Sequence, residues 1–292
     1  MVTPDFRDCF VTVDGGLRLH YRDYAGAVGS TATGGTPVVC LPGLTRNCRD
    51  FDALAPYLAA STGRRILAPD LRGRGGSDHD AEWRNYRLDV YVRDLAAVLD
   101  AAGVARVIII GTSLGGLVGM VFAGSFGERV AGLVLNDIGP ELEVAGMLRI
   151  ATTVGTAAAA KSWEAAAADV QAANESAFPD FTAADWLQFA RRIYREEAPE
   201  RIVRDFDPNV GRAVREPSGP VPDFWAIFAA LRELPMMCLR GELSDLLGER
   251  TVERMTELHP GMQFASIPLR GHAPTLDEPS SRAAIDRFLA AL

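Results

Sequence analysis

The sequence predicts an α/β protein that is built on a mostly parallel sheet. Short apolar runs of strand length alternate along the chain with segments whose apolar residues recur about every 3.6 positions. The middle runs are apolar at nearly every position, as expected of parallel strands that are covered on both faces. The first run alternates instead, which is typical of an antiparallel strand at a sheet edge. The predicted strands are 17–24, 37–41, 65–69, 106–112, 130–136, 235–241 and 263–268.

Helical segments lie between these strands or after the last one, as crossover connections should. The spacing predicts helices at 51–60, 91–103, 249–261 and 280–292. Between residues 139 and 224 the pattern changes, because alanine-rich helical stretches follow one another with no predicted strand between them. We therefore divide the chain into a core of residues 1–138 and 225–292 and a helical insertion of residues 139–224.

The composition restricts the partners that we expect. The 292 residues carry a formal charge of −8 at pH 7, from 30 Lys and Arg against 38 Asp and Glu. An acidic chain has no electrostatic reason to bind phosphate backbones or anionic lipid, so we expect neither nucleic acid nor membrane as a partner. The amino terminus lacks the apolar run of a secretion signal, and the four cysteines form no C-x-x-C pair. These features predict a cytoplasmic protein and leave its oligomeric state open.

One short stretch, "GTSLG" at residues 111–115, has the pattern G-x-S-x-G between a predicted strand and a helix-like segment. A serine on so tight a turn takes a strained backbone conformation, and bulkier neighbours would collide, which explains the flanking glycines. The turn exposes the Ser113 hydroxyl at the positive end of the following helix. Ser113 is therefore the candidate nucleophile, and the alternative is a glycine-rich turn that only packs the helix on the strand.

This strand, turn and helix resemble the nucleophile elbow of the α/β-hydrolase superfamily, and the resemblance covers nearly the whole chain. It implies an α/β-hydrolase fold, with a mostly parallel eight-stranded sheet flanked by helices. It also implies that residues 139–224 form a helical cap over the nucleophile and that no cofactor or metal is needed.

The resemblance further implies a histidine base and an acid, in the chain order serine, acid, histidine. Of the four histidines, His272 is the one in a loop after the last core strand. For the acid, residues 241–245 match a G-x-x-[SA]-D run of related hydrolases, which makes Asp245 the preferred candidate. Asp137, at the end of the preceding core strand, is the alternative, because some relatives supply the acid from there.

An oxyanion hole needs backbone amides that point at the developing negative charge. The family pattern implies the amide of Leu114, directly after the nucleophile, and that of Leu44, in the loop after an early strand. Many relatives carry His-Gly where this chain has Pro42 and Gly43. The proline lacks an amide hydrogen, but the expected donor lies two positions later. The alternative is that this loop is an ordinary turn.

Together these residues predict a serine hydrolase that cleaves a small or medium carboxylic ester through an acyl-enzyme, like a carboxylesterase. The same residues would serve a lactonase, a thioesterase or a carbon-carbon bond hydrolase, since a triad does not determine the leaving group. From other classes, a cofactor-free oxygenase or a non-catalytic ligand receptor of the same fold remain alternatives. The sequence predicts a small ester-like substrate without specifying which one.

Overall fold

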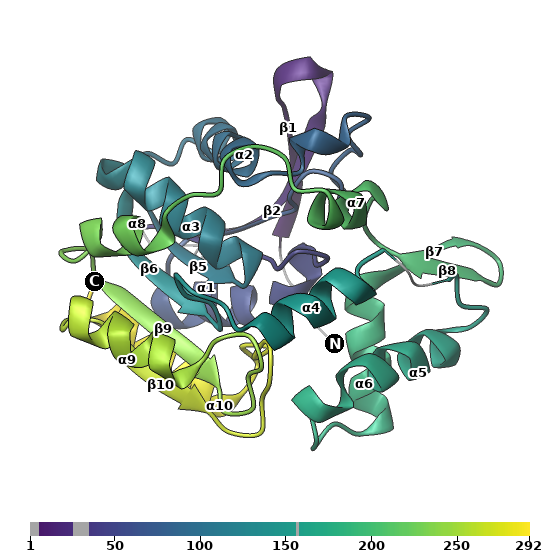
Figure 1. Cartoon of the computed structure of the whole chain (residues 1–292). Helices are drawn as coiled ribbons and strands as arrows, with labels where there is room; N and C mark the ends of the chain where they lie inside the picture. Colours follow the sequence, from purple (N-terminus) through teal and green to yellow (C-terminus); the bar gives the residue numbers. More distant parts are fainter. Residues whose placement is uncertain (1–5, 26–34, 156–157) are drawn as a thin grey trace.

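A computed structural model describes residues 6–25, 35–155 and 158–292. Its centre is an eight-stranded sheet of order β1-β2-β4-β3-β5-β6-β9-β10 (Figure 1). β2 pairs antiparallel with β1 and β4, and the remaining neighbours are parallel. The strands are β1 (Phe6–Thr12), β2 (Arg18–Tyr24), β3 (Val38–Leu41), β4 (Ile66–Pro69), β5 (Val107–Thr112), β6 (Val130–Asn136), β9 (Met236–Gly241) and β10 (Gln263–Ile267).

Two hydrophobic clusters cover the two faces of this sheet. Side chains of β5 alternate between them, since Ile109 belongs to one cluster and its neighbours Ile108 and Ile110 belong to the other. Helices α2, α3, α8 and α9 contribute to the first cluster, and α1 and α10 contribute to the second. The helices are α1 (Leu54–Thr62), α2 (Leu88–Ala101), α3 (Leu114–Ser125), α8 (Phe224–Ala230), α9 (Glu249–Leu258) and α10 (Pro279–Ala290).

Residues 139–224 form a group of elements beside the carboxyl ends of the central strands (Figure 1). A third hydrophobic cluster packs α5 and α6 together, and Thr182 and Asp185 form a capping box at the start of α6. The elements are α4 (Val144–Thr153), α5 (Trp163–Asn174), α6 (Ala183–Ile193), β7 (Tyr194–Ala198), β8 (Arg201–Arg204) and α7 (Asn209–Arg215). The expectation of a strand-free insertion was wrong, because β7 and β8 pair as an antiparallel hairpin.

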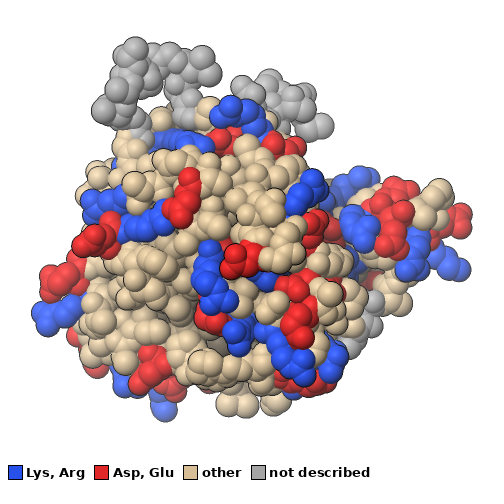
Figure 2. Space-filling view, turned by 90° about the horizontal axis from the view of Figure 1, so that it is seen from above, with Lys and Arg blue, Asp and Glu red and all other residues tan. Residues whose placement is uncertain are grey.

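The predicted sheet is otherwise confirmed. All seven predicted strands are present, and the eighth strand is β1, whose alternately exposed side chains carry little apolar signal. Within the described residues, no helix has the length and apolar character needed to cross a membrane. On the face seen in Figure 2, basic and acidic side chains lie interspersed rather than separated by sign. Ion pairs such as Arg84 with Glu82 are frequent on the surface.

Candidate active site

Ser113 occupies the turn between β5 and α3, at the carboxyl edge of the sheet. Its backbone has φ 52° and ψ −117°, a conformation that few residues other than glycine adopt. A Cβ at Gly111 would lie 2.5 Å from the Gly115 backbone, and one at Gly115 would lie 2.2 Å from the carbonyl oxygen of Leu41. The two flanking glycines are therefore required by close backbone approach, as the sequence predicts.

His272 lies in the loop between β10 and α10 and bridges two residues that come from other parts of the chain. Its Nε2 is 2.9 Å from Ser113 Oγ, and its Nδ1 is 2.8 Å from Asp137 Oδ2. The imidazole is nearly buried, with 9% of the side chain exposed. The structure thus brings the predicted serine and histidine into hydrogen-bond contact, with a carboxylate on the far side of the ring.

The carboxylate at His272 is that of Asp137, which follows the central strand β6 and is fully buried. Its Oδ1 accepts a hydrogen bond of 2.8 Å from the Gly241 amide, and its Oδ2 accepts one of 2.7 Å from the Ser244 hydroxyl. Three donors therefore converge on one buried carboxylate. These hydrogen bonds fix the direction in which the carboxylate faces the imidazole.

The structure corrects the preferred acid of the sequence analysis, Asp245. Its carboxylate accepts two hydrogen bonds from Arg149 on α4, of 2.6 Å from Nε and 2.7 Å from Nη2. Hydrogen bonding to Arg149 also lowers the pKa of Asp245. The G-x-x-S-D run does reach the site, but through the Ser244 hydroxyl, which donates to Asp137. Asp245, one residue later, is bound to Arg149 instead.

The loop after β3 lies against the serine, because β3 and β5 are neighbouring parallel strands. A Cβ at Gly43 would lie 3.7 Å from Ser113 Cβ, so the backbone at this point runs directly beside the nucleophile. Among the hydrogen bonds between described residues, none has the amide of Leu44 or Leu114 as donor. Their role as oxyanion donors stays a prediction.

Arg74, from the loop after β4, is hydrogen-bonded to the loop after β3 at Leu44. Its Nε donates a hydrogen bond of 2.8 Å to the Leu44 carbonyl oxygen. The side chain is completely buried, and its guanidinium lies between the rings of Tyr86 and Tyr91, 5.4 Å and 5.1 Å from their centroids. The arginine therefore restrains the loop through the Leu44 carbonyl, an interaction that the sequence pattern alone did not reveal.

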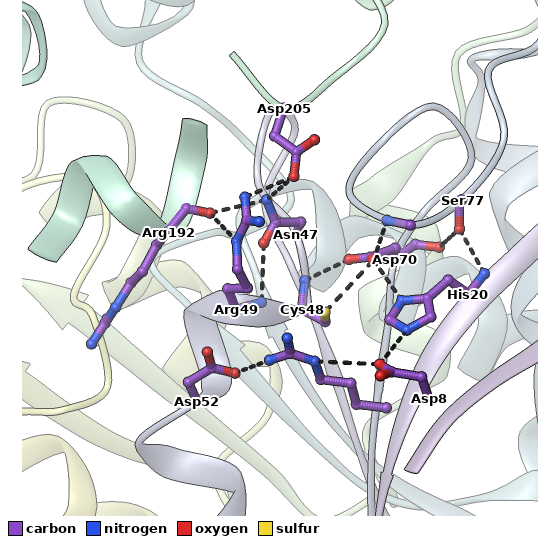
Figure 3. A network of polar contacts seen from close by, with 12 residues as sticks. Asp8, His20, Asn47, Cys48, Arg49, Asp52, Asp70, Ser77, Arg192 and Asp205 are labelled. Carbon is purple, nitrogen blue, oxygen red and sulfur yellow. Dashed lines mark hydrogen bonds and ion pairs between the residues drawn. The ribbon is translucent and has the colours of Figure 1, made fainter. Parts of the chain in front are cut away.

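A second polar cluster braces the loops after β3 and β4 (Figure 3). His20 lies between Asp70 and Asp8, with its ring nitrogens 2.8 Å from a carboxylate oxygen of each. Asp70 also accepts hydrogen bonds from the amides of Cys48 and Gly76. The His20, Cys48 and Asp70 side chains offer donor atoms within 4.8 Å of one another, as a metal site would. Since Asp70 already accepts bonds on both oxygens, we interpret the group as a hydrogen-bonded brace.

A pocket of about 430 Å³ contains both Ser113 and His272. One wall comes from the core loops and includes Leu44, and the other comes from residues 139–224 and includes Ile150 and Phe189. The volume lies within the range of small-molecule sites. The hydrogen-bonded pair of Ser113 and His272 therefore lies at the wall of a pocket with both polar and apolar lining residues.

The comparisons with known proteins agree with this architecture. A family model for the alpha/beta hydrolase fold matches residues 36–265, and the chain belongs to this family. The 3-hydroxybutyrate-oligomer hydrolase of Cupriavidus necator is 32% identical over 259 residues, which cover 86% of this chain and 87% of that protein. A solved alpha/beta hydrolase from Novosphingobium aromaticivorans has a TM-score of 0.91 and 40% identity, covering 98% of this chain and 99% of that chain.

A shorter match relates the chain to the lipase LipV of Mycobacterium tuberculosis, with 38% identity over 121 residues. This match covers 41% of this chain and 42% of that protein. The α/β-hydrolase resemblance and the fold predicted from the sequence are thus confirmed, and the protein is a member of a family of hydrolases.

Proposed function

We propose that the protein is a serine hydrolase that cleaves a carboxylic ester through an acyl-enzyme. The observation that carries this proposal is the Ser113–His272 contact of 2.9 Å, with Asp137 bound to the opposite ring nitrogen. A serine hydroxyl is a weak nucleophile unless a base takes its proton, and this geometry supplies the base. In the proposal, Asp137 replaces Asp245 as the residue that orients the histidine and stabilises its positive charge.

The proposed reaction has two halves. Ser113 Oγ attacks the ester carbonyl carbon while its proton passes to His272 Nε2, and the new oxyanion is bound by the Leu44 and Leu114 amides. The carbon-oxygen bond to the alcohol then breaks, and the alkoxide leaves with the proton from His272. A water molecule next gives a proton to His272 and attacks the acyl carbon. The bond from that carbon to Ser113 Oγ then breaks, Oγ takes the proton back from His272, and the acid is released.

We further propose that residues 139–224 act as a cap that closes the pocket and selects the substrate. Two observations support a small or medium ester. The pocket volume of about 430 Å³ suits a molecule of that size, and the Cupriavidus necator relative is named for hydrolysing 3-hydroxybutyrate oligomers. Short esters of hydroxy acids are therefore the first substrates to test.

The test combines one variant with a chemical probe. Ser113→Ala should lower kcat for p-nitrophenyl esters by about 10⁵- to 10⁶-fold, since no other group can form the acyl-enzyme. A fluorophosphonate should label the wild-type protein at Ser113 and leave the variant unlabelled. Ser125→Ala, at the exposed end of α3, is the control and should keep both labelling and activity. Ester turnover by Ser113→Ala at the wild-type rate would refute the mechanism.

A further inference from the structure

Arginines are unusually frequent in the pocket that contains Ser113. Five of them line it, and a single acidic residue, Asp50, does so. Four of the five have a carboxylate partner within 4 Å. The paired arginines are Arg46 with Asp50, Arg149 with Asp245, Arg192 with Asp277, and Arg201 with Glu197.

The fifth arginine is Arg204, at the end of β8. Within the described residues, it has no carboxylate closer than 4 Å, and its guanidinium lies 4.6 Å from the ring centroid of Tyr194. Burial is the main effect that lowers the pKa of Arg204; Tyr194 opposes it, the positive charge of Arg46 adds to it, and Asp169 has a smaller opposing effect. A partly buried cation near a second cation is stabilised by an anion that binds close to both.

Asp205, the next residue after Arg204, anchors this part of the chain and binds other cations (Figure 3). Asp205 is buried and accepts hydrogen bonds of 2.7 Å from Arg49 and 3.3 Å from Asn47, in the loop after β3. Arg195 lies 3.4 Å from its second oxygen. The end of the hairpin is therefore attached to the core, and the carboxylate next to Arg204 in the chain is bound by residues other than Arg204.

Arg46 and Arg204 line the same pocket as Ser113. The Cγ of Arg46 would lie 3.4 Å from a Cβ at Gly43, and Ser113 Cβ would lie 3.7 Å from the same point. Arg46 itself is held by two hydrogen bonds to Asp50, of 2.7 Å and 2.6 Å, with its guanidinium 4.2 Å from the Phe189 ring. A group bound by Arg46 and Arg204 would therefore share the pocket with a carbonyl group at Ser113.

We propose that Arg204, together with Arg46, binds a carboxylate of the substrate, so that the enzyme prefers esters that carry a free carboxylate at the end of the chain. The inference rests on the proposed ester hydrolysis and assigns its substrate class. A planar guanidinium suits this role because it binds a carboxylate through two parallel hydrogen bonds. A neutral ester of the same length would leave the partly buried Arg204 without a carboxylate partner, and would bind less well.

The test compares two esters that differ only at the far end of the acyl chain. These are the p-nitrophenyl monoester of adipic acid, which ends in a carboxylate, and p-nitrophenyl hexanoate, which ends in a methyl group. The wild-type protein should have the higher kcat/KM for the adipate monoester. Arg204→Gln should lower kcat/KM for that ester by about 10- to 100-fold, mainly through KM, since one charged hydrogen-bonding partner is lost. Its activity on hexanoate should stay within about twofold.

Two further variants separate charge at this position from charge in general. Arg204→Lys should retain part of the preference, because the charge remains and the bidentate geometry is lost. Arg191→Gln removes the same charge from an exposed site outside the pocket, on α6, and should leave both activities unchanged. If Arg204→Gln lowered the two activities equally, or if the wild-type protein did not prefer the adipate monoester, the inference would be wrong.

A binding measurement distinguishes this inference from the proposed hydrolysis. Titration of adipate into the Ser113→Ala variant by calorimetry needs no turnover. If the double variant Ser113→Ala, Arg204→Gln no longer binds adipate, the result supports the carboxylate site even if no ester is hydrolysed. Adipate binding that does not depend on Arg204 overturns the site, whether or not esters are cleaved.

Discussion

Replacing Asp137 by Asn is the sharpest test of the active-site assignment. The buried carboxylate accepts bonds from the Gly241 amide, the Ser244 hydroxyl and His272 Nδ1, and all three partners are donors in the working state. An asparagine amide keeps the shape but offers one acceptor oxygen and a nitrogen that only donates. At least one partner then faces a donor, and the imidazolium that forms in the transition state loses its counter-charge.

Two magnitudes follow from these contacts. Loss of the charge and of the correct tautomer should lower kcat by about 10³- to 10⁴-fold. At 1.36 kcal/mol for each factor of ten, this decrease corresponds to about 4–5.5 kcal/mol of transition-state stabilisation. The free energy of unfolding should fall by about 1–3 kcal/mol, because one buried donor is left without an acceptor. The protein should therefore still fold, and the loss of rate should be measurable on the folded variant.

Asp245→Asn is the matched control, since it changes the same atoms in the neighbouring loop. The Asp245 side chain is 39% exposed and bound to Arg149, and a partly exposed ion pair contributes about 0–1 kcal/mol. Its kcat for a p-nitrophenyl ester should change by less than about threefold. Rates and active-site titration with a fluorophosphonate give kcat per folded site for both variants. A larger loss in Asp245→Asn than in Asp137→Asn would refute the assignment.

Two further predictions concern stability and are both measured by denaturant unfolding. Gly115→Ala should cost about 3 kcal/mol or more, because its Cβ would lie 2.2 Å from the Leu41 carbonyl oxygen, whereas Gly127→Ala, with nothing within 4 Å, should change stability by about 0.5 kcal/mol or less. His20 is the other site: burial opposes its charging, but hydrogen bonds and charges of Asp70 and a second carboxylate prevail and raise its pKa. A raised pKa stabilises the fold below the unfolded value of 6.5, and this contribution disappears as pH rises through the folded value. The wild type should therefore exceed His20→Gln in stability by about 1–3 kcal/mol at pH 6 and by less at pH 9, and a difference that grows with pH would contradict this reasoning.

The central strands of the fold were predictable because each is apolar along its whole length. Val107 to Ile110 in β5 are all completely buried, and a run of this kind has few alternatives to a parallel strand. β1 escaped prediction because it is an exposed edge strand whose residues are placed by pairing with β2. The β7–β8 hairpin escaped for a related reason, since its charged strands "YREEA" and "RIVR" lack the apolar signal of a core strand.

At the site, local pattern and chain order were sufficient for the contact between Ser113 and His272, but not for the acid. Asp245 and Asp137 both follow strands that end at the same sheet edge, and spacing cannot tell which carboxylate faces the imidazole. The deciding interactions are tertiary: Arg149, far away in the sequence, binds Asp245, while Ser244 turns toward Asp137. Arg204 likewise lies in no motif. That it lacks a carboxylate partner becomes visible only when the ion pairs of the other pocket arginines are known.

The anchoring of Asp137 directly after β6 has a consequence for how such an enzyme can change. All three hydrogen-bonded residues, Ser113, Asp137 and His272, lie outside residues 139–224, whereas Arg149, Arg192 and Arg204 lie within them. In the proposed function, the three residues that cleave the ester all lie in the core, whereas Arg204, the main residue of the proposed carboxylate site, lies in the insertion. Exchanging the insertion with that of a relative should therefore change the substrate preference while ester cleavage is retained.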